Sequence, residues 1–171
     1  CHVLDPGPGN TPPLFTDFTY DNLGIPKNPE NPFYTMPLEI NPQGYRWVDK
    51  GLGGFLRTRL DFREHWLDNI GKHKVPTLRN IDKRPQPDFV KSYGHNGYFK
   101  DLKQIVHFYN TRDTLGICRG FDGEIEGETC WPPPEVTLNV NSDELGDLKL
   151  TEAEEDAIVA FLKTLTDGHA D

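Results

Sequence analysis

The sequence predicts a single, mainly α-helical domain over residues 1–171, with long loops between its helices. Its 171 residues are the length of one ordinary domain. Three segments carry apolar residues at helical spacing, and no segment of useful length alternates between apolar and polar residues as a strand would. The 16 glycines and 15 prolines exceed the usual share of these residues and favour turns.

The N-terminal segment, residues 6–54, is predicted to be a loop region, because its prolines prevent long helices. Its aromatic residues have no helical or strand period, which is typical of loops wrapped around a bulky apolar object. An ordinary loop layer over a protein core is the alternative. The aromatic residues are Phe15, Phe18, Tyr20, Phe33, Tyr34, Tyr45 and Trp47.

Three helices follow, over residues 58–70, 101–110 and 151–166. The first would end at Gly71, and the second would begin at an Asp101 N-cap. The third begins with Thr151 and Glu154 in the spacing of a capping box. The three apolar faces consist of Phe62, Trp66, Leu67 and Ile70, of Leu102, Ile105, Val106 and Tyr109, and of Ile158, Phe161, Leu162 and Leu165. Residues 111–149 are predicted to form a long loop.

Charge and hydropathy argue against nucleic-acid binding and exclude a membrane-spanning protein. With 18 basic and 27 acidic residues the net charge is −9, so the chain is a poor nucleic-acid binder, because such affinity depends on basic contacts to phosphate. No apolar run approaches the roughly 18 residues of a membrane-spanning helix. The acidic surface instead favours partners with a basic docking surface.

Two of the three cysteines, Cys118 and Cys130, lie in the long C-terminal loop and are predicted to form a disulfide. Closing this short loop would stabilise the fold by roughly 2–3 kcal/mol and indicates an oxidising compartment. Two free thiols are the alternative.

The remaining cysteine, Cys1, is followed directly by His2. Cys-His is the end of the C-x-x-C-H motif, in which a thioether attaches haem and the histidine binds its iron. A lipid-modified N-terminal cysteine and a truncated terminus are the alternatives that the dipeptide leaves open.

Several blocks downstream of Cys1-His2 resemble the C-terminal haem domain of the bacterial di-haem cytochrome c peroxidase and MauG family. They span nearly the whole chain in the order that the family has. The blocks are Leu14-Phe15-Thr16-Asp17, Asn22-Leu23-Gly24-Ile25-Pro26, Gly51-Leu52-Gly53-Gly54-Phe55-Leu56, Lys74-Val75-Pro76-Thr77-Leu78-Arg79-Asn80, His95-Asn96-Gly97-Tyr98-Phe99, Val106-His107-Phe108-Tyr109-Asn110 and residues 148–155.

The resemblance implies an all-α, cytochrome c-like domain with one haem c bound through Cys1. It also implies His2 as the proximal iron ligand and Tyr109 as the distal one, at the place where the peroxidases have methionine and MauG-like proteins have tyrosine. A phenolate ligand favours a low reduction potential. Met36, the only methionine, is the alternative distal ligand, and His107 or water are further alternatives.

Other residues receive roles from the same resemblance. Phe15 and Arg79 would contact the haem, with Arg79 as a partner for a propionate. From its residue type alone, Arg79 is a surface or loop-anchoring arginine, which is the alternative. His95 would either fix its loop or lie between redox centres. A family calcium ion would fall near the backbone of Val90 and Ser92. The other histidines, His65, His73 and His169, are expected on the surface.

The resulting prediction is a periplasmic or otherwise extracytoplasmic electron-transfer domain, equivalent to the C-terminal half of a di-haem protein whose upstream haem domain is missing from this sequence. Peroxide chemistry would require that second haem domain. A haem-free, lipid-anchored binding module on Cys1 is the alternative from another class. The expected partners are redox proteins and the second haem domain.

Overall fold

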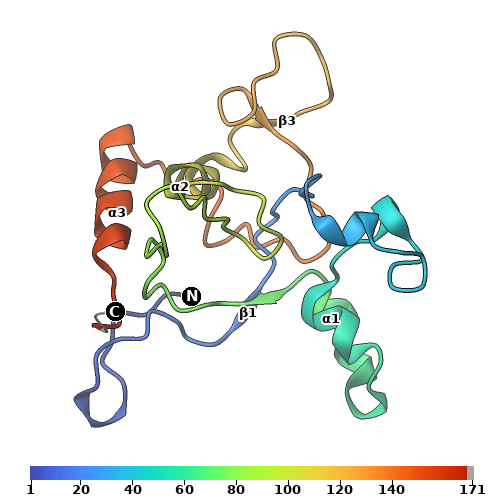
Figure 1. Ribbon diagram of the computed structural model, residues 1–171, viewed down its shortest axis with the longest axis horizontal. Coiled ribbons are helices and arrows are strands. Elements are labelled where there is room, and N and C mark those ends of the chain that lie inside the picture. Colours follow the sequence, from blue (N-terminus) through green and yellow to red (C-terminus); the bar gives the residue numbers. More distant parts are fainter. Residues whose placement is uncertain (169–171) are drawn as a thin grey trace.

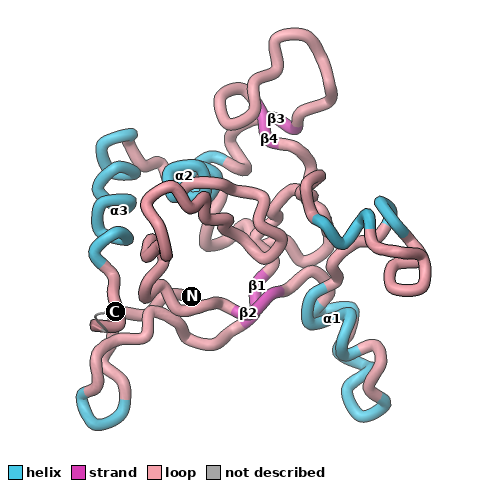
Figure 2. The backbone as a smooth tube through the Cα atoms, viewed as in Figure 1, coloured by secondary structure: helices cyan, strands magenta, loops and turns pink. Residues whose placement is uncertain are grey.

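The computed structural model describes residues 1–168 and contains more loop than regular structure (Figure 1). The helices and strands lie within a frame of long loops, and the strands are only two residues long (Figure 2). The α-helices are α1 (Gly51–Leu56), α2 (Leu102–Thr111) and α3 (Glu152–Thr164). The 3-10 helices are η1 (Pro8–Asn10), η2 (Pro32–Thr35), η3 (Gly44–Arg46), η4 (Leu60–His65) and η5 (Leu67–Asn69). The strands are β1 (Tyr20–Asp21), β2 (His73–Lys74), β3 (Gly116–Ile117) and β4 (Cys130–Trp131).

Helices α2 and α3 confirm two of the predicted helices, and their N-termini explain why. The Asp101 side chain accepts a hydrogen bond from the backbone N–H of Gln104 and so caps α2. Thr151 and Glu154 form the predicted capping box at the start of α3. The two helices pack against each other, and α2 holds the buried Val106 and Phe108.

The predicted helix over residues 58–70 is wrong. Helix α1 ends at Leu56, and the 3-10 helices η4 and η5 follow it. The chain folds back so closely that a Cβ on Gly53 would lie 2.5 Å from the backbone nitrogen of Ile70. The predicted apolar face has little to pack against, since Phe62 and Leu67 are each 53% exposed. Tertiary folding therefore overrides the helical period here.

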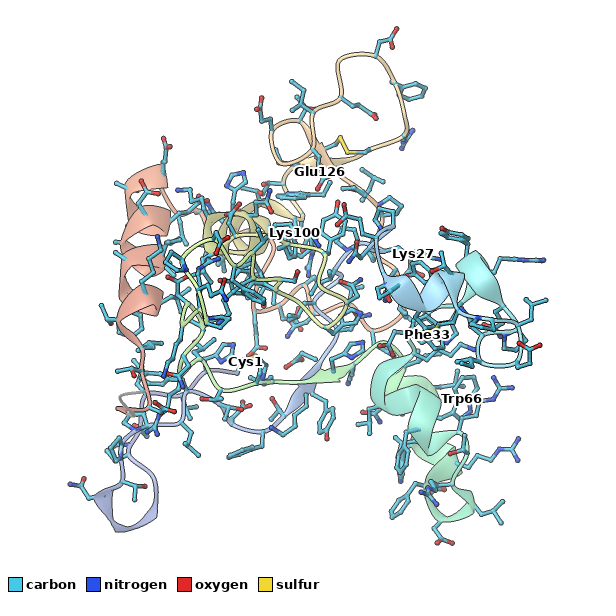
Figure 3. The ribbon with its side chains drawn as sticks, in the orientation of Figure 1. Cys1, Lys27, Phe33, Trp66, Lys100 and Glu126 are labelled. Atoms are coloured by element: carbon cyan, nitrogen blue, oxygen red, sulfur yellow. A yellow bond between two sulfur atoms is a disulfide. The ribbon has the colours of Figure 1, made fainter. Side chains whose placement is uncertain are left out.

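Two short strand pairs fix loops that are far apart in sequence. Strands β1 and β2 are antiparallel, with Asp21 opposite His73. Strands β3 and β4 are parallel, and the predicted disulfide between Cys118 and Cys130 is present beside them (Figure 3). The disulfide closes the base of the loop between Cys118 and Cys130 (Figure 3).

The core is an aromatic cluster beneath α2. Phe108 is fully buried and Phe99 is 1% exposed. The ring centroids of Phe108 and Trp131 lie 5.1 Å apart in a T-shaped contact. The Trp131 indole N–H donates to the Thr111 hydroxyl at 3.1 Å, so the polar atom of this buried ring has a partner.

Buried asparagine side chains hold the loops together where strands are short, and we call these residues the amide clamps. The Asn22 side-chain nitrogen donates to the carbonyls of Val136 (2.9 Å) and Leu138 (2.8 Å). Asn41 and Asn110 also donate to backbone carbonyls and are equally buried. These bonds satisfy loop carbonyls that would otherwise be buried without a partner.

Candidate functional site

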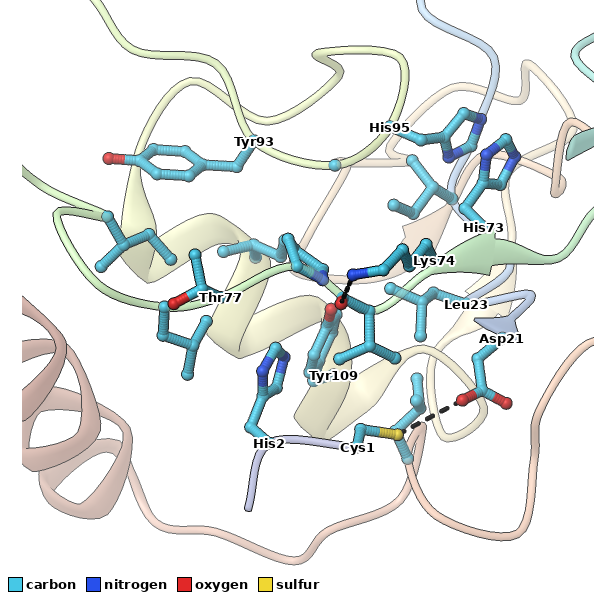
Figure 4. A pocket seen from close by; sticks show the side chains of 18 of the residues that line it. Cys1, His2, Asp21, Leu23, His73, Lys74, Thr77, Tyr93, His95 and Tyr109 are labelled. Carbon is cyan, nitrogen blue, oxygen red and sulfur yellow. Dashed lines mark hydrogen bonds between the residues drawn. The ribbon is translucent and has the colours of Figure 1, made fainter. Parts of the chain in front are cut away.

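A cavity of about 430 Å³ lies between the N-terminal segment, the β1–β2 pair, residues 92–95 and α2 (Figure 4). This volume falls within the roughly 300–1,000 Å³ of small-molecule and cofactor sites. Its wall is largely apolar, which excludes water and suits a large, flat apolar group. The apolar lining comprises Leu23, Ile25, Val75, Pro76, Leu78, Ile81, Ile105 and Leu145.

Cys1 and His2 both line this cavity. The Nδ1 atom of His2 lies 2.7 Å from the carbonyl oxygen of Phe15. Because a carbonyl only accepts, Nδ1 must carry the proton, and the lone pair of Nε2 is left for a ligand. Phe15 has a positive φ of 53°, a backbone conformation that few residues adopt. The local backbone thus sets the histidine tautomer that a metal ligand requires.

Tyr109 reaches the same cavity from α2 (Figure 4). Burial raises the pKa of its phenol, although the positive charge of Arg112 opposes this. Within residues 1–168 its hydroxyl makes no hydrogen bond to another side chain or to the backbone. Burial therefore favours the neutral phenol over the phenolate. A metal ion bound next to the oxygen would favour the phenolate instead.

The two other side chains proposed as distal ligands do not reach the cavity. Met36 follows η2 and is 42% exposed, outside the cavity lining. Both ring nitrogens of His107 are already bonded, Nδ1 to Glu155 at 2.8 Å and Nε2 to the carbonyl of Gly127 at 2.8 Å. The geometry favours Tyr109 over both.

Arg79 and Phe15 lie beside the cavity but do not line it. The Arg79 guanidinium donates to the carbonyls of Pro13 (2.9 Å) and Pro12 (2.7 Å), so it anchors the N-terminal loop. The cation that lines the cavity is Lys74, which sequence reasoning did not single out. Its position in the block that contains Arg79 was the available signal.

His95 lines the cavity and is stacked on His73, with ring centroids 3.7 Å apart and planes 10° from parallel. The prediction that His73 is a surface residue is wrong, because its Nε2 is buried without a hydrogen-bond partner. Burial, together with His95, lowers the pKa of His73 to about 4, so its ring is neutral at pH 7. His65 is exposed beside Glu64 as expected, and His169 lies outside the described residues.

The two residues near the expected calcium ion, Val90 and Ser92, are both exposed. Ser92 lines the cavity, and Val90 is 66% exposed. Nothing in their side chains adds to the expectation of calcium, which concerned backbone carbonyls.

Comparison with known proteins identifies relatives over nearly the whole chain, although no family profile matches. The chain is 35% identical to the methylamine utilization protein MauG of Paracoccus denitrificans (strain Pd 1222) over 156 residues, covering 90% of this chain and 35% of MauG. It is 27% identical to the cytochrome-c peroxidase IdrP1 of Denitromonas iodatirespirans over 164 residues, again 35% of that protein.

Among solved structures, the diheme peroxidase BthA from Burkholderia thailandensis E264 is similar, with a TM-score of 0.58 and 28% identity. The match covers 98% of this chain and 38% of BthA. The chain spans about a third of the length of these relatives. Over nearly its whole length, the chain is thus homologous to one part of MauG and of the diheme cytochrome c peroxidases.

Proposed function

We propose that the chain is a c-type haem domain that transfers electrons, with Cys1 attaching the haem and His2 binding its iron. The observation that carries this proposal is the 2.7 Å hydrogen bond from His2 Nδ1 to the Phe15 carbonyl, which leaves Nε2 free beside an apolar cavity. The relatives support it, since they include cytochrome-c peroxidases and a diheme peroxidase.

The cavity residues fit a haem. The apolar wall would exclude water from the macrocycle, and Cys1 lies next to His2, as thioether attachment requires. Lys74 would offer its ammonium group to a propionate. When bound, the haem supplies one-electron chemistry at its iron. The chain's own part is to hold His2 in one tautomer and to keep Tyr109 in reach of the metal.

We propose Tyr109 as the second axial ligand. Its phenol lines the cavity, whereas Met36 and His107 do not. Oxygen ligation by a phenolate stabilises ferric iron, and this choice would give the domain a low reduction potential.

Residues 1–171 would form one cytochrome c-like, all-α haem domain, equivalent to the C-terminal domain of its longer relatives. The disulfide supports an oxidising compartment such as the periplasm. Among the described residues, no helix has the length and apolar character needed to cross a membrane. The expected partners are a second haem domain and soluble redox proteins.

A second candidate function is peroxide-dependent oxidation together with another haem domain. The names of the relatives favour it, and their length, about three times that of this chain, indicates that the activity would need the remainder of such a protein. A lipid-anchored module is less well supported, because the Cys1 side chain lines the cavity and lies 3.4 Å from the Asp21 carboxylate.

Haem staining of a denaturing gel tests the proposal on protein made in a host that matures c-type cytochromes. We expect a stained band, and haem that acid acetone removes would contradict covalent attachment. We expect Tyr109→Phe to change the ferric absorption spectrum, while the matched Met36→Leu variant leaves it unchanged. The reverse result would assign the ligand to Met36.

A further inference from the structure

Four chemically suited side chains from separate segments converge at the edge of the cavity, and we call them the His-carboxylate cluster. Its members are Asp49, His73, His95 and Glu135. Ligand atoms of Asp49, His73 and His95 all lie within 4.8 Å of one another. Glu135 completes the group, with its Oε2 atom 3.4 Å from His95 Nε2.

The cluster contains a buried carboxylate, Glu135, whose one ion-pair partner among the described residues is His95, and that ring carries a charge only when protonated. The Glu135 side chain is 2% exposed and that of His95 is 16% exposed. The carboxylate of Glu135 accepts hydrogen bonds from Tyr34 (3.3 Å) and Asn96 (3.2 Å). Within the described part of the chain, no lysine or arginine forms an ion pair with it. Buried carboxylates are normally paired with a cation or coordinate a metal.

The cluster also contains an unused ligand atom. Nε2 of His73 is buried and has no hydrogen-bond partner, which is costly for a polar atom. The ring is neutral at pH 7, as a metal ligand must be, because burial lowers its pKa to about 4. Hydrogen bonds from His95 and Asn96 overcome the effect of burial on Glu135 and hold its pKa below the usual value, so it is ionised.

We propose that the His-carboxylate cluster binds a divalent transition-metal ion of the zinc type. Two imidazoles and two carboxylates supply four ligands and two negative charges, which balance one divalent ion. Imidazole nitrogen favours zinc and its neighbours over calcium, which prefers oxygen.

The geometry requires only a small adjustment. Ligands at roughly 2.0–2.1 Å from a tetrahedral zinc ion lie about 3.4 Å apart. The ligand atoms of Asp49, His73 and His95 lie within 4.8 Å of one another, so they must approach by at most about 1.4 Å. One of the stacked imidazole rings would turn to direct its lone pair at the metal. Backbone N–H groups already hold the two carboxylates in place. The Gly51 N–H donates to the Asp49 carboxylate at 2.9 Å, and the Asp49 N–H donates to the Glu135 carboxylate at 3.3 Å.

Equilibrium dialysis of the intact, haem-loaded protein tests the proposal. The protein is stripped of loose metal with a chelator, dialysed against micromolar Zn²⁺, and analysed for zinc and iron by mass spectrometry. We expect one zinc per chain, retained in excess Ca²⁺. His73→Phe keeps an aromatic ring but removes both nitrogens, and we expect it to weaken zinc binding by more than about tenfold. His65→Phe is the matched control, because this exposed histidine lies outside the cluster.

Three results decide the matter. Zinc should raise the melting temperature of the wild type and of His65→Phe but not of His73→Phe. If His73→Phe does not fold, His95→Gln takes its place in both measurements. The proposal is overturned if the wild type binds no zinc at micromolar concentration, or if both cluster variants bind zinc as tightly as the wild type. Haem staining of the same protein reads the haem proposal separately, so a stained protein that binds no zinc overturns this inference alone.

Discussion

The attachment of α2 to α3 depends on one buried carboxylate, Glu155, whose exposed fraction is 3%. Its Oε1 atom accepts hydrogen bonds from Asn110 at 2.7 Å and from His107 at 2.8 Å. Its Oε2 atom lies 3.1 Å from the ammonium nitrogen of Lys103. Burial opposes ionisation of Glu155, but the bonds from Asn110, His107 and Lys103 outweigh this and hold its pKa below the usual value.

Glu155→Gln keeps the shape of the side chain and removes its charge. A hydrogen bond to a charged group contributes about 1.5–3 kcal/mol and a neutral one about 0.5–1.5 kcal/mol, so the bonds from Asn110 and His107 lose about 1 kcal/mol each. Lys103 is 36% exposed, and solvent screening limits its share to roughly 0–1 kcal/mol. We expect the free energy of unfolding to fall by about 2–3 kcal/mol at pH 7, which lowers the melting temperature by roughly 4–12 °C.

The loss should depend on pH. Folding lowers the pKa of Glu155, so between the folded and the unfolded pKa the unfolded state binds more protons than the folded state. The stabilisation is complete above the unfolded pKa and is lost as the pH falls through the folded pKa. The wild type therefore loses this contribution in acid, whereas the glutamine variant has none to lose. The difference in stability between the two proteins should shrink as the pH falls.

Urea unfolding followed by circular dichroism measures this difference at neutral and acidic pH. Glu152→Gln is the control, since it removes an exposed carboxylate from the same helix. We expect that control to change the stability by less than about 0.5 kcal/mol. The reasoning would be refuted by a Glu155→Gln effect as small as that of the control, or by an effect that does not change with pH.

Three further predictions concern the rest of the fold and its surface. Cys118→Ser combined with Cys130→Ser should cost up to about 3 kcal/mol, the value expected for a loop of this length, and unfolding of the wild type with a reductant should give the same stability. If the reductant leaves the wild type unchanged, the disulfide has no role in stability. Phe108→Ala should destabilise the fold by about 3–5 kcal/mol in the same assay, because the side chain is fully buried, and a loss below about 1 kcal/mol would contradict its core position. Electron exchange with a basic redox protein should slow as salt is added, because the net charge of this chain is −9 and 0.1 M salt screens charge–charge attraction beyond about 10 Å. Stopped-flow kinetics measure this rate, and a rate independent of salt would contradict electrostatic steering.

Local sequence signals predicted the parts of the fold that depend on nearby residues. The caps at Asp101 and Thr151 and the apolar faces that follow them were sufficient to place α2 and α3. Residues 58–70 have an equally good helical period, but the close approach of Gly53 to Ile70 depends on how the chain folds back. A period in one segment carries no information about that contact.

In the candidate site, too, sequence signals point to some residues, whereas the contacts that orient them depend on the fold. A motif, a helical face and a family resemblance singled out Cys1, His2 and Tyr109, and all three line one cavity. The Phe15 carbonyl that orients His2 could not be identified in this way, because it depends on a backbone conformation with positive φ. The position of His73 depends on the two-residue pairing of β2 with β1, which is too short to leave a pattern in the sequence.

The amide clamps have a consequence for how this protein tolerates mutation. In most proteins loops accept substitutions more readily than helices. Here Asn22, Asn41 and Asn110 each use side-chain N–H groups as donors to loop carbonyls. Aspartate has the same shape but, when ionised, no donor, and it would direct a negative charge at those carbonyls. Variation among homologues should therefore be lower at Asn22 and Asn41 in the loops and at Asn110 in α2 than on the solvent face of α3, so that the buried loop carbonyls constrain the sequence more than the exposed helix surface does.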